Sequence, residues 1–354
     1  MHRLEKPNRS SDIQKWIFLA SAAPHPNPLP RGKRELVTRM SDETPYARLT
    51  PDLVLDAVTT CGLWPDGRLL ALNSYENRVW QVGLEDRAPV IAKFYRPHRW
   101  SDAAILEEQA FAQELADAEL PVVAPLTFTG RTLLHHDGFR YTLSPRHGGR
   151  APSLESADQL EWLGRLIARM HAVGSRAVFA HRGRIDRATL IAQPMQAVLA
   201  SGLLPAGVSE RYRQAVERMD RLVAARFDAV GPVRTLRLHG DCHPGNVLWT
   251  DAGPHFVDLD DARMGPAVQD LWMLAHDETA MEALLEGYAS MRDFDHAELA
   301  LIPALRAMRQ VHYAGWIAAR WHDPAFPAAF PFAAEPRWWE QHITDLHEQA
   351  DELE

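Results

Sequence analysis

The chain has 354 residues, of which 46% are hydrophobic and 24% charged, as in an ordinary globular protein with one large domain or two modest ones. Its formal net charge of -9 opposes binding to a phosphate backbone, so we expect no nucleic-acid partner. The two cysteines give no disulfide framework and favour a reducing compartment. No apolar run approaches the roughly 18 residues that cross a bilayer, so we expect no membrane partner.

The first 39 residues differ from the rest of the chain. Residues 16–23 (WIFLASAA) follow several basic residues and resemble a minimal signal peptide, at the lower end of the usual length. The next stretch, PHPNPLPRGKRE, is rich in proline and charge and cannot pack a core. Regular patterning begins at Met40. We therefore expect residues 1–39 to be disordered or to arise from an upstream start codon.

Residues 69–97 have the pattern of strands. Segment 77–84 (NRVWQVGL) alternates and is rich in β-forming residues, and segment 89–95 (PVIAKFY) is the expected return strand after a polar turn. Ser101 is a good N-cap, so we expect a helix from there to about Leu115. Two more strand-like stretches follow, VVAPLTF and FRYTLSP, with LLHHDG between them.

The pattern changes after Ser144–Arg150 (SPRHGGR), whose proline and paired glycines are typical of a hinge. Apolar residues between 160 and 170 recur at intervals of three and four, and Gly174 can end that helix. Further helices are expected over residues 208–227, 267–291 and 298–321.

This order of elements predicts an α+β chain with two lobes. A small β-rich N-terminal lobe with one main helix would cover residues 40–147, and a larger helical lobe would cover residues 148–354. The cleft between two such lobes is a common place for a ligand site.

Segment 236–263, LRLHGDCHPGNVLWTDAGPHFVDLDDAR, carries most of the recognisable chemistry. Its LRL and HFVDL pieces look like two short buried strands with a polar loop between them. Asp241 lies on that loop, Asn246 follows five residues later, and Asp258 ends the second strand. This is the layout of a kinase catalytic loop followed by a metal-binding aspartate. Phosphoryl transfer requires mainly positioning and charge neutralisation, which such residues supply.

Asp241 and Asp258 are the expected catalytic residues. Asp241 would accept or orient the proton of the attacking hydroxyl, while Asn246 and Asp258 would hold Mg²⁺ against the phosphates of ATP, the co-substrate. Each residue alone could simply cap a turn. A transition-metal site at His239, Asp241 and His243 is the other alternative, but the sequence has no second histidine-rich cluster to complete it. The combined pattern favours phosphoryl transfer.

Several neighbours of this motif have plainer expected roles. His239 is read as a hydrogen-bonding residue that fixes the loop. Asp260 and Asp261 could touch a second ion, but we expect them to be solvated or paired with Arg263. Asp270 begins a helix, where a negative charge is favourable, and it could also hydrogen-bond the backbone of the catalytic loop.

The β-rich lobe should supply a cation for the phosphates. Lys93 lies within the apolar strand VIAKFY, where a charge needs a partner or a ligand, although a lysine on an edge strand could also extend to water. Glu107 and Glu108 on the next helix are both candidate partners. We favour Glu108, because it shares the apolar stripe of that helix.

No glycine-rich phosphate motif occurs in the sequence, neither GxGxxG nor GxxxxGK[ST]. LNSYENRVW occupies the corresponding place. Ser74 and the backbone of residues 73–77 could donate hydrogen bonds to phosphate, although Asn and Ser are also common turn residues. The expected nucleotide-binding residues are therefore Ser74, Lys93 and Glu108.

At this level of detail the chain resembles a known family. HGDxHPGN followed by VDLDDAR is similar to the aminoglycoside/choline-kinase-like branch of the protein kinase fold, which tolerates a phosphate loop without glycines. More narrowly, the resemblance is to the bacterial stress response kinase A family, over about Leu49 to Trp339. The segments that carry it are LNSYENRVWQV, IAKFYRPHRWS, LRLHGDCHPGN, FVDLDDARMGPAVQDLWML and LRAMR.

The resemblance implies a two-lobed kinase fold and a cytoplasmic, magnesium-dependent serine/threonine protein kinase that counters stress-linked cell death. It also implies Asp241 as proton acceptor, Asn246 and Asp258 as magnesium ligands, and Ser74 in the ATP site. The departures are residues 1–39, outside the shared region, and one extra residue in WTDAGPHF before Asp258.

The acceptor of the phosphate is the open question. The same branch includes kinases of drugs, choline and homoserine, and fold does not determine substrate. A small cationic alcohol would need an acidic pocket, which the net charge of -9 permits. Tyr313, Trp316, Trp321 and the Trp338–Trp339 pair could border the acceptor site or simply pack the helical lobe.

The family resemblance favours a protein serine or threonine hydroxyl as acceptor. The alternative is a small-molecule kinase that acts on an alcohol of the choline, homoserine or aminoglycoside type. A catalytically silent nucleotide-binding protein would have lost part of the motif, whereas every expected residue is present here. We expect the protein to act as a monomer.

Overall fold

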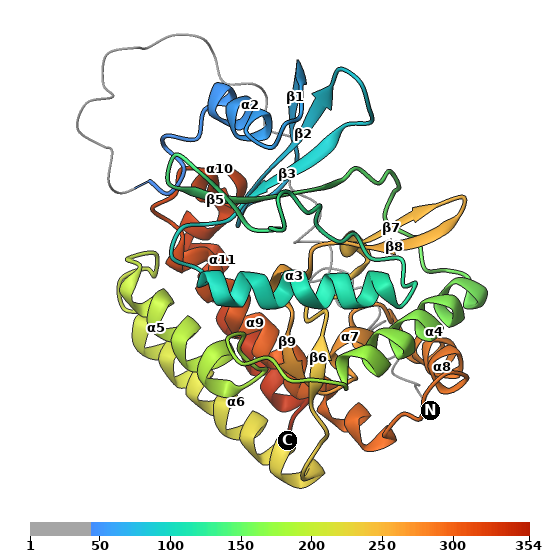
Figure 1. The fold of residues 1–354 in the computed structure, drawn as a ribbon. Helices are drawn as coiled ribbons and strands as arrows, with labels where there is room; N and C mark the ends of the chain where they lie inside the picture. Colours follow the sequence, from blue (N-terminus) through green and yellow to red (C-terminus); the bar gives the residue numbers. More distant parts are fainter. Residues whose placement is uncertain (1–43) are drawn as a thin grey trace.

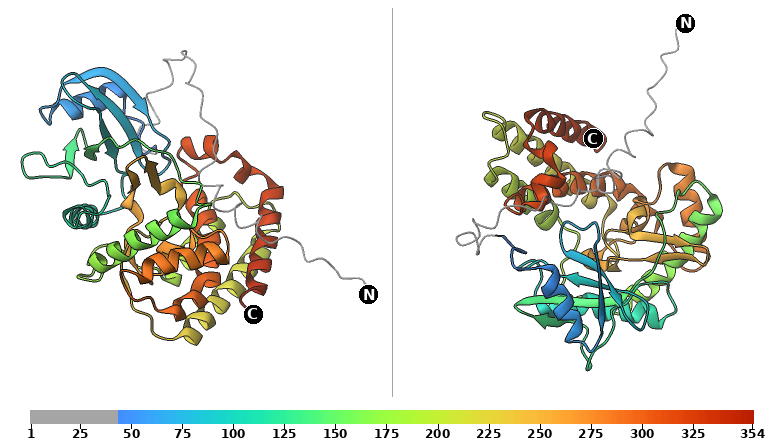
Figure 2. Two further views of the ribbon diagram at one scale, coloured as in Figure 1. Left: turned by 90° about the vertical axis from the view of Figure 1, so that its right-hand side faces the viewer. Right: turned by 90° about the horizontal axis from the view of Figure 1, so that it is seen from above.

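The computed structural model describes residues 44–354, so the expectations for residues 1–39 lie outside the described part. The described chain forms two lobes, a β-rich one and a larger helical one, as predicted (Figure 1). Figure 2 shows the same division from two further directions. Within residues 44–354, no helix combines the length and the apolar character that crossing a membrane would require.

An antiparallel sheet of five strands forms the N-terminal lobe, in the order β1-β2-β3-β5-β4. The strands are β1 (Pro65–Ala71), β2 (Arg78–Leu84), β3 (Val90–Phe94), β4 (Leu134–His136) and β5 (Phe139–Pro145). Helix α2 (Pro51–Thr59) packs its buried Val54, Ala57 and Val58 on one face of this sheet.

The alternation of β3 decides which way Lys93 points. Val90, Ala92 and Phe94 are buried in the core that α2 covers, so Ile91 and Lys93 face the other side of the sheet. Lys93 lies opposite Val79 of β2 in the ladder. The strand therefore directs its one charged side chain toward the other lobe.

Helix α3 (Asp102–Asp117) begins where the sequence predicts, because the Ser101 hydroxyl accepts a hydrogen bond from Ala104 N at 3.2 Å. Its Phe111 and Leu115 belong to the main core of the helical lobe. Helix α3 therefore connects the sheet to the other lobe. The predicted strand VVAPLTF is wrong: it makes only isolated bridges, and β4 forms in the stretch between the two predicted strands.

The helical lobe follows a connection through residues 146–156. Its helices are α4 (Ala157–Gly174), α5 (Gln193–Ala200), α6 (Ser209–Val230), α7 (Gln269–Trp272), α8 (Glu278–Ala289), α9 (Ile302–Ala319), α10 (Ala325–Ala329) and α11 (Pro336–Asp351). Short helical segments of other types are η1 (Ala188–Ala192), η2 (Pro244–Asn246), η3 (Leu259–Asp261), η4 (His296–Leu301) and η5 (Pro331–Ala334).

Two expected helices differ from the structure. The single helix predicted for residues 267–291 is divided into α7 and α8, because Asp277 caps a new helix by accepting a hydrogen bond from Ala280 N at 2.8 Å. The helix expected over 298–321 begins as η4 and becomes α-helical only at Ile302, with Pro303 in its first turn.

The two strands expected around the catalytic motif do not pair with each other. Strand β6 (Leu236–Leu238) pairs with β9 (Arg263–Gly265), and β7 (Val247–Thr250) forms a hairpin with β8 (Gly253–Phe256). The predicted HFVDL strand therefore ends at Phe256, before Asp258. Both small ladders bracket the polar loop between them.

Helices α4 and α8 cross with their backbones in contact. A Cβ atom on Gly164 would overlap the carbonyl oxygen of Leu284, and one on Gly287 would overlap the carbonyl oxygen of Glu161. Only glycine fits at this crossing, and the crossing supports the core behind the catalytic loop.

We expect Gly164→Ala to destabilise the fold by about 1–3 kcal/mol, the usual cost of overpacking, because the added methyl group must separate α4 from α8. Urea unfolding would measure it. Gly148→Ala is the control, since no atom lies within 4 Å of a Cβ built there. Equal midpoints of urea unfolding for the two variants would contradict the close contact between α4 and α8.

Candidate active site

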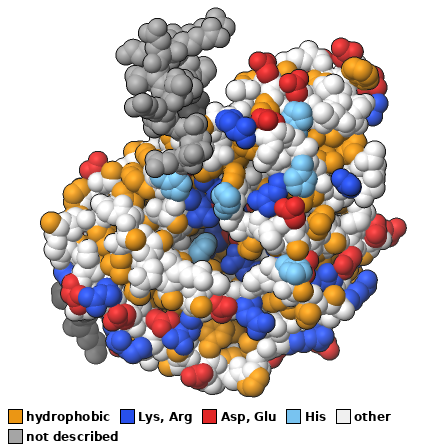
Figure 3. All heavy atoms as spheres, turned by 60° about the vertical axis from the view of Figure 1, so that its left-hand side comes forward, with side chains coloured by type: hydrophobic (Ala, Val, Ile, Leu, Met, Phe, Trp, Pro, Cys, Tyr) orange, Lys and Arg blue, Asp and Glu red, His pale blue; other side chains and the backbone are white. Residues whose placement is uncertain are grey.

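A cavity of about 2420 Å³ lies between the lobes. The β1–β2 loop, β3 and the end of β5 line it from the N-terminal lobe, and residues 240–246, residues 257–263 and one face of α9 line it from the helical lobe. In the space-filling view one face of the molecule is hollowed, and Lys, Arg and His side chains gather there (Figure 3). All six predicted site residues line this cavity: Ser74, Lys93, Glu108, Asp241, Asn246 and Asp258.

The catalytic loop is held from behind by Asp270. This fully buried carboxylate in α7 accepts hydrogen bonds from the backbone N–H groups of His239 and Gly240, both at 2.8 Å, and lies 3.1 Å from His171 Nε2. His239 itself hydrogen-bonds the carbonyl of Val257 at 2.9 Å. The expected loop-fixing roles of Asp270 and His239 are therefore both present.

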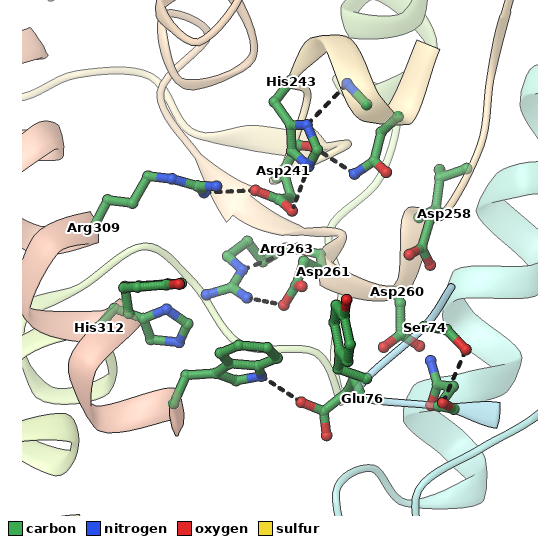
Figure 4. A pocket seen from close by; sticks show the side chains of 18 of the residues that line it. Ser74, Glu76, Asp241, His243, Asp258, Asp260, Asp261, Arg263, Arg309 and His312 are labelled. Carbon is green, nitrogen blue, oxygen red and sulfur yellow. Dashed lines mark hydrogen bonds and ion pairs between the residues drawn. The ribbon is translucent and has the colours of Figure 1, made fainter. Parts of the chain in front are cut away.

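Asp241 is held between two cationic or potentially cationic groups. Its Oδ1 accepts a hydrogen bond from Arg309 at 2.6 Å, and its Oδ2 lies 3.5 Å from His243 Nε2 (Figure 4). Burial raises the pKa of Asp241, but Arg309 and His243 outweigh it and hold the pKa well below its usual value. The group is thus an ionised hydrogen-bond acceptor, suited to orienting a hydroxyl.

Asn246 is oriented by the same loop. Its Nδ2 donates to the carbonyl of Asp241 at 2.9 Å, and within residues 44–354 no protein hydrogen bond reaches its Oδ1. Its own carbonyl accepts from Val257 N at 3.0 Å, which joins the catalytic loop to the residue before Asp258. The amide oxygen is therefore the atom that Asn246 can offer to a cation.

Asp258 has a strained backbone, with φ 60° and ψ 64° in the left-handed region. Such a conformation costs about 1 kcal/mol or more for a residue with a side chain, and aspartate tolerates it better than most. The side chain remains 54% exposed and lies 3.3 Å from Lys93 Nζ. The strain thus directs a carboxylate into the cavity instead of burying it.

Three carboxylates surround Lys93. Its Nζ lies 3.2 Å from Asp260, 3.3 Å from Asp258 and 3.7 Å from Glu108. Burial lowers the pKa of Lys93, but the three carboxylates together raise it well above its usual value. Lys93 is therefore a permanent cation at the cavity wall.

The structure places Glu108, and not Glu107, beside Lys93. Glu108 is buried and also lies 3.9 Å from Arg182. Glu107 instead accepts hydrogen bonds from the backbone N–H groups of residues 180–182, at 2.7, 2.8 and 3.0 Å. These adjacent residues of α3 thus have different roles: Glu108 faces the cavity, and Glu107 ties α3 to the helical lobe.

The expectation for Asp260 is wrong. It is 3% exposed and pairs with Lys93 and Arg99, not with solvent or Arg263. Burial raises its pKa, but Arg99 and Lys93 outweigh that effect and lower it. Asp261 does pair with Arg263, at 2.5 Å.

Sequence reasoning missed two arginines that brace this segment, the buried Arg182 and the partly buried Arg99. Arg182 donates to the carbonyls of Ala104, Asp260 and Ala262, so it links α3 to the residues that follow Asp258. Arg99 binds both Asp260 and Asp261. Arg99 lies in the segment IAKFYRPHRWS, whose conspicuous basic residues were the only available indication.

The loop between β1 and β2 stands where a glycine-rich loop would be. The Ser74 hydroxyl donates to the carbonyl of Asn77 at 3.1 Å and accepts from Val79 N at 3.2 Å. Its side chain therefore shapes the turn, while the loop around it lines the cavity.

Glu76 joins this loop to the helical lobe. Its carboxylate lies 2.6 Å from Trp316 Nε1 on α9 and 2.6 Å from Nε of Arg320, which directly follows α9. It also lies 2.9 Å from Arg96 Nε of its own lobe. Arg96 in turn lies 2.7 Å from Asp323, just beyond α9. Arg78 lies 3.1 Å from the same carboxylate of Asp323. We call Glu76, Arg78, Arg96, Arg320 and Asp323 the interlobe clamp.

The aromatic residues near the C-terminus pack the helical lobe, as one reading expected, and some of them also line the cavity. Tyr313, Trp316 and Trp321 pack against the buried Phe326 and Phe330. Tyr313, Trp316 and Trp338 also line the cavity, whereas Trp339 is fully buried.

The described residues fit a magnesium–nucleotide site. No group of three or more His, Cys, Asp or Glu side chains among residues 44–354 forms a metal cage. Mg²⁺ in phosphotransferases uses one or two protein ligands together with phosphate oxygens and water. Asn246 Oδ1 and the exposed carboxylate of Asp258 match that need, and Lys93 lies beside them.

Comparison with known proteins agrees with this geometry. Residues 68–302 match the phosphotransferase enzyme family. "Stress response kinase A" of Escherichia coli (strain K12) is 44% identical over 314 residues, which covers 87% of this chain and 95% of that protein. The chain belongs to the stress response kinase A family. It is a phosphotransferase.

Two further likenesses are informative. "Serine/threonine protein kinase RdoA" of Salmonella typhimurium is 44% identical over 309 residues, covering 86% of this chain and 93% of that protein. The solved structure of amicoumacin kinase hAmiN, with AMP-PNP and Ca²⁺, aligns with a TM-score of 0.63 at 18% identity, over 81% of this chain and 92% of that one. The latter supports the kinase-like fold and its two lobes.

We expect Asp323→Ala to destabilise the protein by about 3 kcal/mol, because it leaves two clustered arginines without their shared, 2% exposed carboxylate. Urea unfolding would measure the loss. Asp220→Ala breaks the partly exposed pair with Arg187 and should cost no more than about 1 kcal/mol. A smaller loss in the Asp323 variant than in this control would contradict the clamp.

His312 should make stability depend on pH. Burial and the nearby Arg263 lower its pKa to about 3, against an ordinary 6.5. The unfolded chain therefore binds a proton first, so the contribution of neutral His312 is complete above pH 6.5 and is lost as the pH falls toward 3. His312→Gln should reduce the stability lost between pH 7 and pH 5 by on the order of 1 kcal/mol in urea unfolding. Identical pH profiles would contradict a depressed pKa.

Proposed function

We propose that this chain is an ATP- and Mg²⁺-dependent serine/threonine protein kinase. In this proposal it transfers the γ-phosphate of ATP to a protein hydroxyl in the cytoplasm and counters stress-linked cell death. One observation carries the proposal: Asp241, Asn246, Asp258 and Lys93, from separate elements, converge on one cavity between the lobes. The identity to a relative named a serine/threonine protein kinase supports the choice of acceptor.

The nucleotide side of the site rests on the N-terminal lobe. Lys93, positioned by Glu108, would bind the phosphates, and the loop that Ser74 shapes would cover them. Asn246 and Asp258 would hold Mg²⁺, which supplies neutralising charge to the phosphate oxygens. The interlobe clamp keeps the covering loop against the helical lobe.

The acceptor side rests on Asp241. Its ionised carboxylate would accept a hydrogen bond from the attacking hydroxyl and align it, and would take the proton as the new bond forms. Arg309 and His243 hold the carboxylate from the other side. Asp270 keeps the loop backbone in place through its two hydrogen bonds.

A small-molecule kinase is the second candidate function. It is favoured by the fold shared with amicoumacin kinase and by the volume of the cavity, about 2420 Å³. Beside the catalytic loop the charges disfavour a cationic alcohol, because Asp241 and Asp261 are each paired with an arginine. An ammonium group would find no unpaired carboxylate at those two positions. Further carboxylates that line the cavity lie at its α11 side.

The deciding experiment incubates the purified protein with Mg²⁺ and γ-labelled ATP. One arm contains a generic protein substrate, and the other contains choline, homoserine and an aminoglycoside. Label on protein that depends on Asp241 would establish a protein kinase. Label on a small alcohol alone would agree with a phosphotransferase but would overturn the proposal that the acceptor is a protein.

We expect Asp241→Asn to lower transfer at least about 100-fold while ATP binding is retained, because Asp241 acts on the hydroxyl. Asp258→Asn should weaken Mg²⁺-dependent ATP binding as well. Calorimetric titration with ATP separates the two. Asp251→Asn, in the exposed β7–β8 turn, is the matched control and should leave both unchanged. Wild-type turnover in the Asp241 variant would overturn the assignment.

A further inference from the structure

One face of α9 lines the cavity beyond Asp241. Arg306, Arg309, Gln310 and Tyr313 are spaced at three, four and seven residues, so they share this face. All four are partly buried. The two arginines belong to LRAMR, a motif that the roles described above leave largely unexplained.

Arg306 is a partly buried cation without a matching anion. Its Nε is buried and has no hydrogen-bond partner within residues 44–354, and no ion pair within 4.0 Å involves its guanidinium there. The guanidinium lies 5.9 Å from the ring centre of Trp272. Burial lowers the pKa of Arg306, which Glu352 only partly opposes. A guanidinium in this setting is stabilised when it gains a carboxylate or phosphate.

Two neighbours on the same face also have unused hydrogen-bonding atoms. Gln310 Oε1 and the Tyr313 hydroxyl are buried and have no hydrogen-bond partner in the described part of the chain. Buried polar atoms in native proteins are normally satisfied, so several on one cavity wall indicate a ligand that completes them.

The charges around Asp241 favour a ligand that carries an anionic group. Arg309 neutralises Asp241, and Arg263 neutralises Asp261. Four carboxylates also line the cavity, from Asp345, Glu348 and Asp351 of α11 and from Glu352 just after it. Asp345 is partly buried, whereas the other three are exposed to water, where screening weakens their repulsion.

We propose that this face of α9 recognises a carboxylate on the acceptor, so that the phosphorylated serine or threonine of the protein substrate has an acidic residue close to it. Arg306 binds that carboxylate, while Gln310 and Tyr313 hydrogen-bond the same segment. This inference rests on the proposed protein kinase function and adds the charge class of its substrate.

The test compares serine peptides that differ only in the residues flanking the serine: glutamates, alanines or lysines. Wild-type protein should show kcat/KM at least about tenfold higher for the glutamate series than for the alanine series, the effect of one charged hydrogen bond. Arg306→Gln should abolish that preference and leave the kcat/KM of the alanine series within about twofold, because the neutral peptide makes no ion pair with it.

Three further variants sharpen the test. Arg306→Lys should keep a reduced preference, and Arg306→Glu should shift it toward the lysine series. Arg337→Gln removes an exposed arginine of α11 that does not line the cavity, and should change nothing. Calorimetric ATP binding in every variant controls for folding.

The outcomes separate the two proposals. Label on the peptides without an acidic preference, or a preference that survives in Arg306→Gln, overturns the inference and leaves the protein kinase intact. Label on no peptide and on no protein, with label on a small alcohol, overturns the proposed function and the inference with it.

Discussion

The site depends on the ion pairs that the ammonium group of Lys93 makes. This group brings together carboxylates from three elements: Glu108 on α3, Asp258 after β8, and Asp260 in the short helical segment that follows. A partly buried group of this kind is stable only when its charges are matched. Arg99 and Arg182 complete the match around Asp260 and tie it to α3. The same ion pairs consequently set the arrangement of the lobes and the position of Asp258, the proposed magnesium ligand.

Besides the contacts around Lys93 and α3, the lobes are joined by the covalent connection after β5 and by the interlobe clamp, which lies between the β1–β2 loop and the residues at and just beyond the end of α9. A loop without glycines cannot wrap closely around phosphates by backbone freedom alone. Here Glu76 and the Ser74 hydroxyl hold it in shape instead. The same helix, α9, carries the residues that we propose to face the acceptor, so the proposed nucleotide and acceptor sides of the cavity share one support.

Local rules determined much of this protein from the sequence by itself. Alternation predicts β2 and β3 and directs Lys93 out of the core, and the Ser101 cap begins α3 where expected. The spacing of Asp241, Asn246 and Asp258 also indicates phosphoryl transfer before any coordinates are seen, because that chemistry needs a base and two hard ligands in fixed order. Each of these inferences depends on residues close together in the chain.

Only the tertiary structure decided which distant groups meet. Glu107 and Glu108 differ by one position, and packing against residues 180–182 selects which of them reaches Lys93. Asp260 is buried because Arg99 and Lys93 arrive from another lobe, and Arg309 reaches Asp241 from a helix 68 positions away. Strand pairing around the catalytic loop likewise joins segments that no local pattern relates. Such contacts are favourable only once the chain has folded, because burial is what makes a charge require its partner.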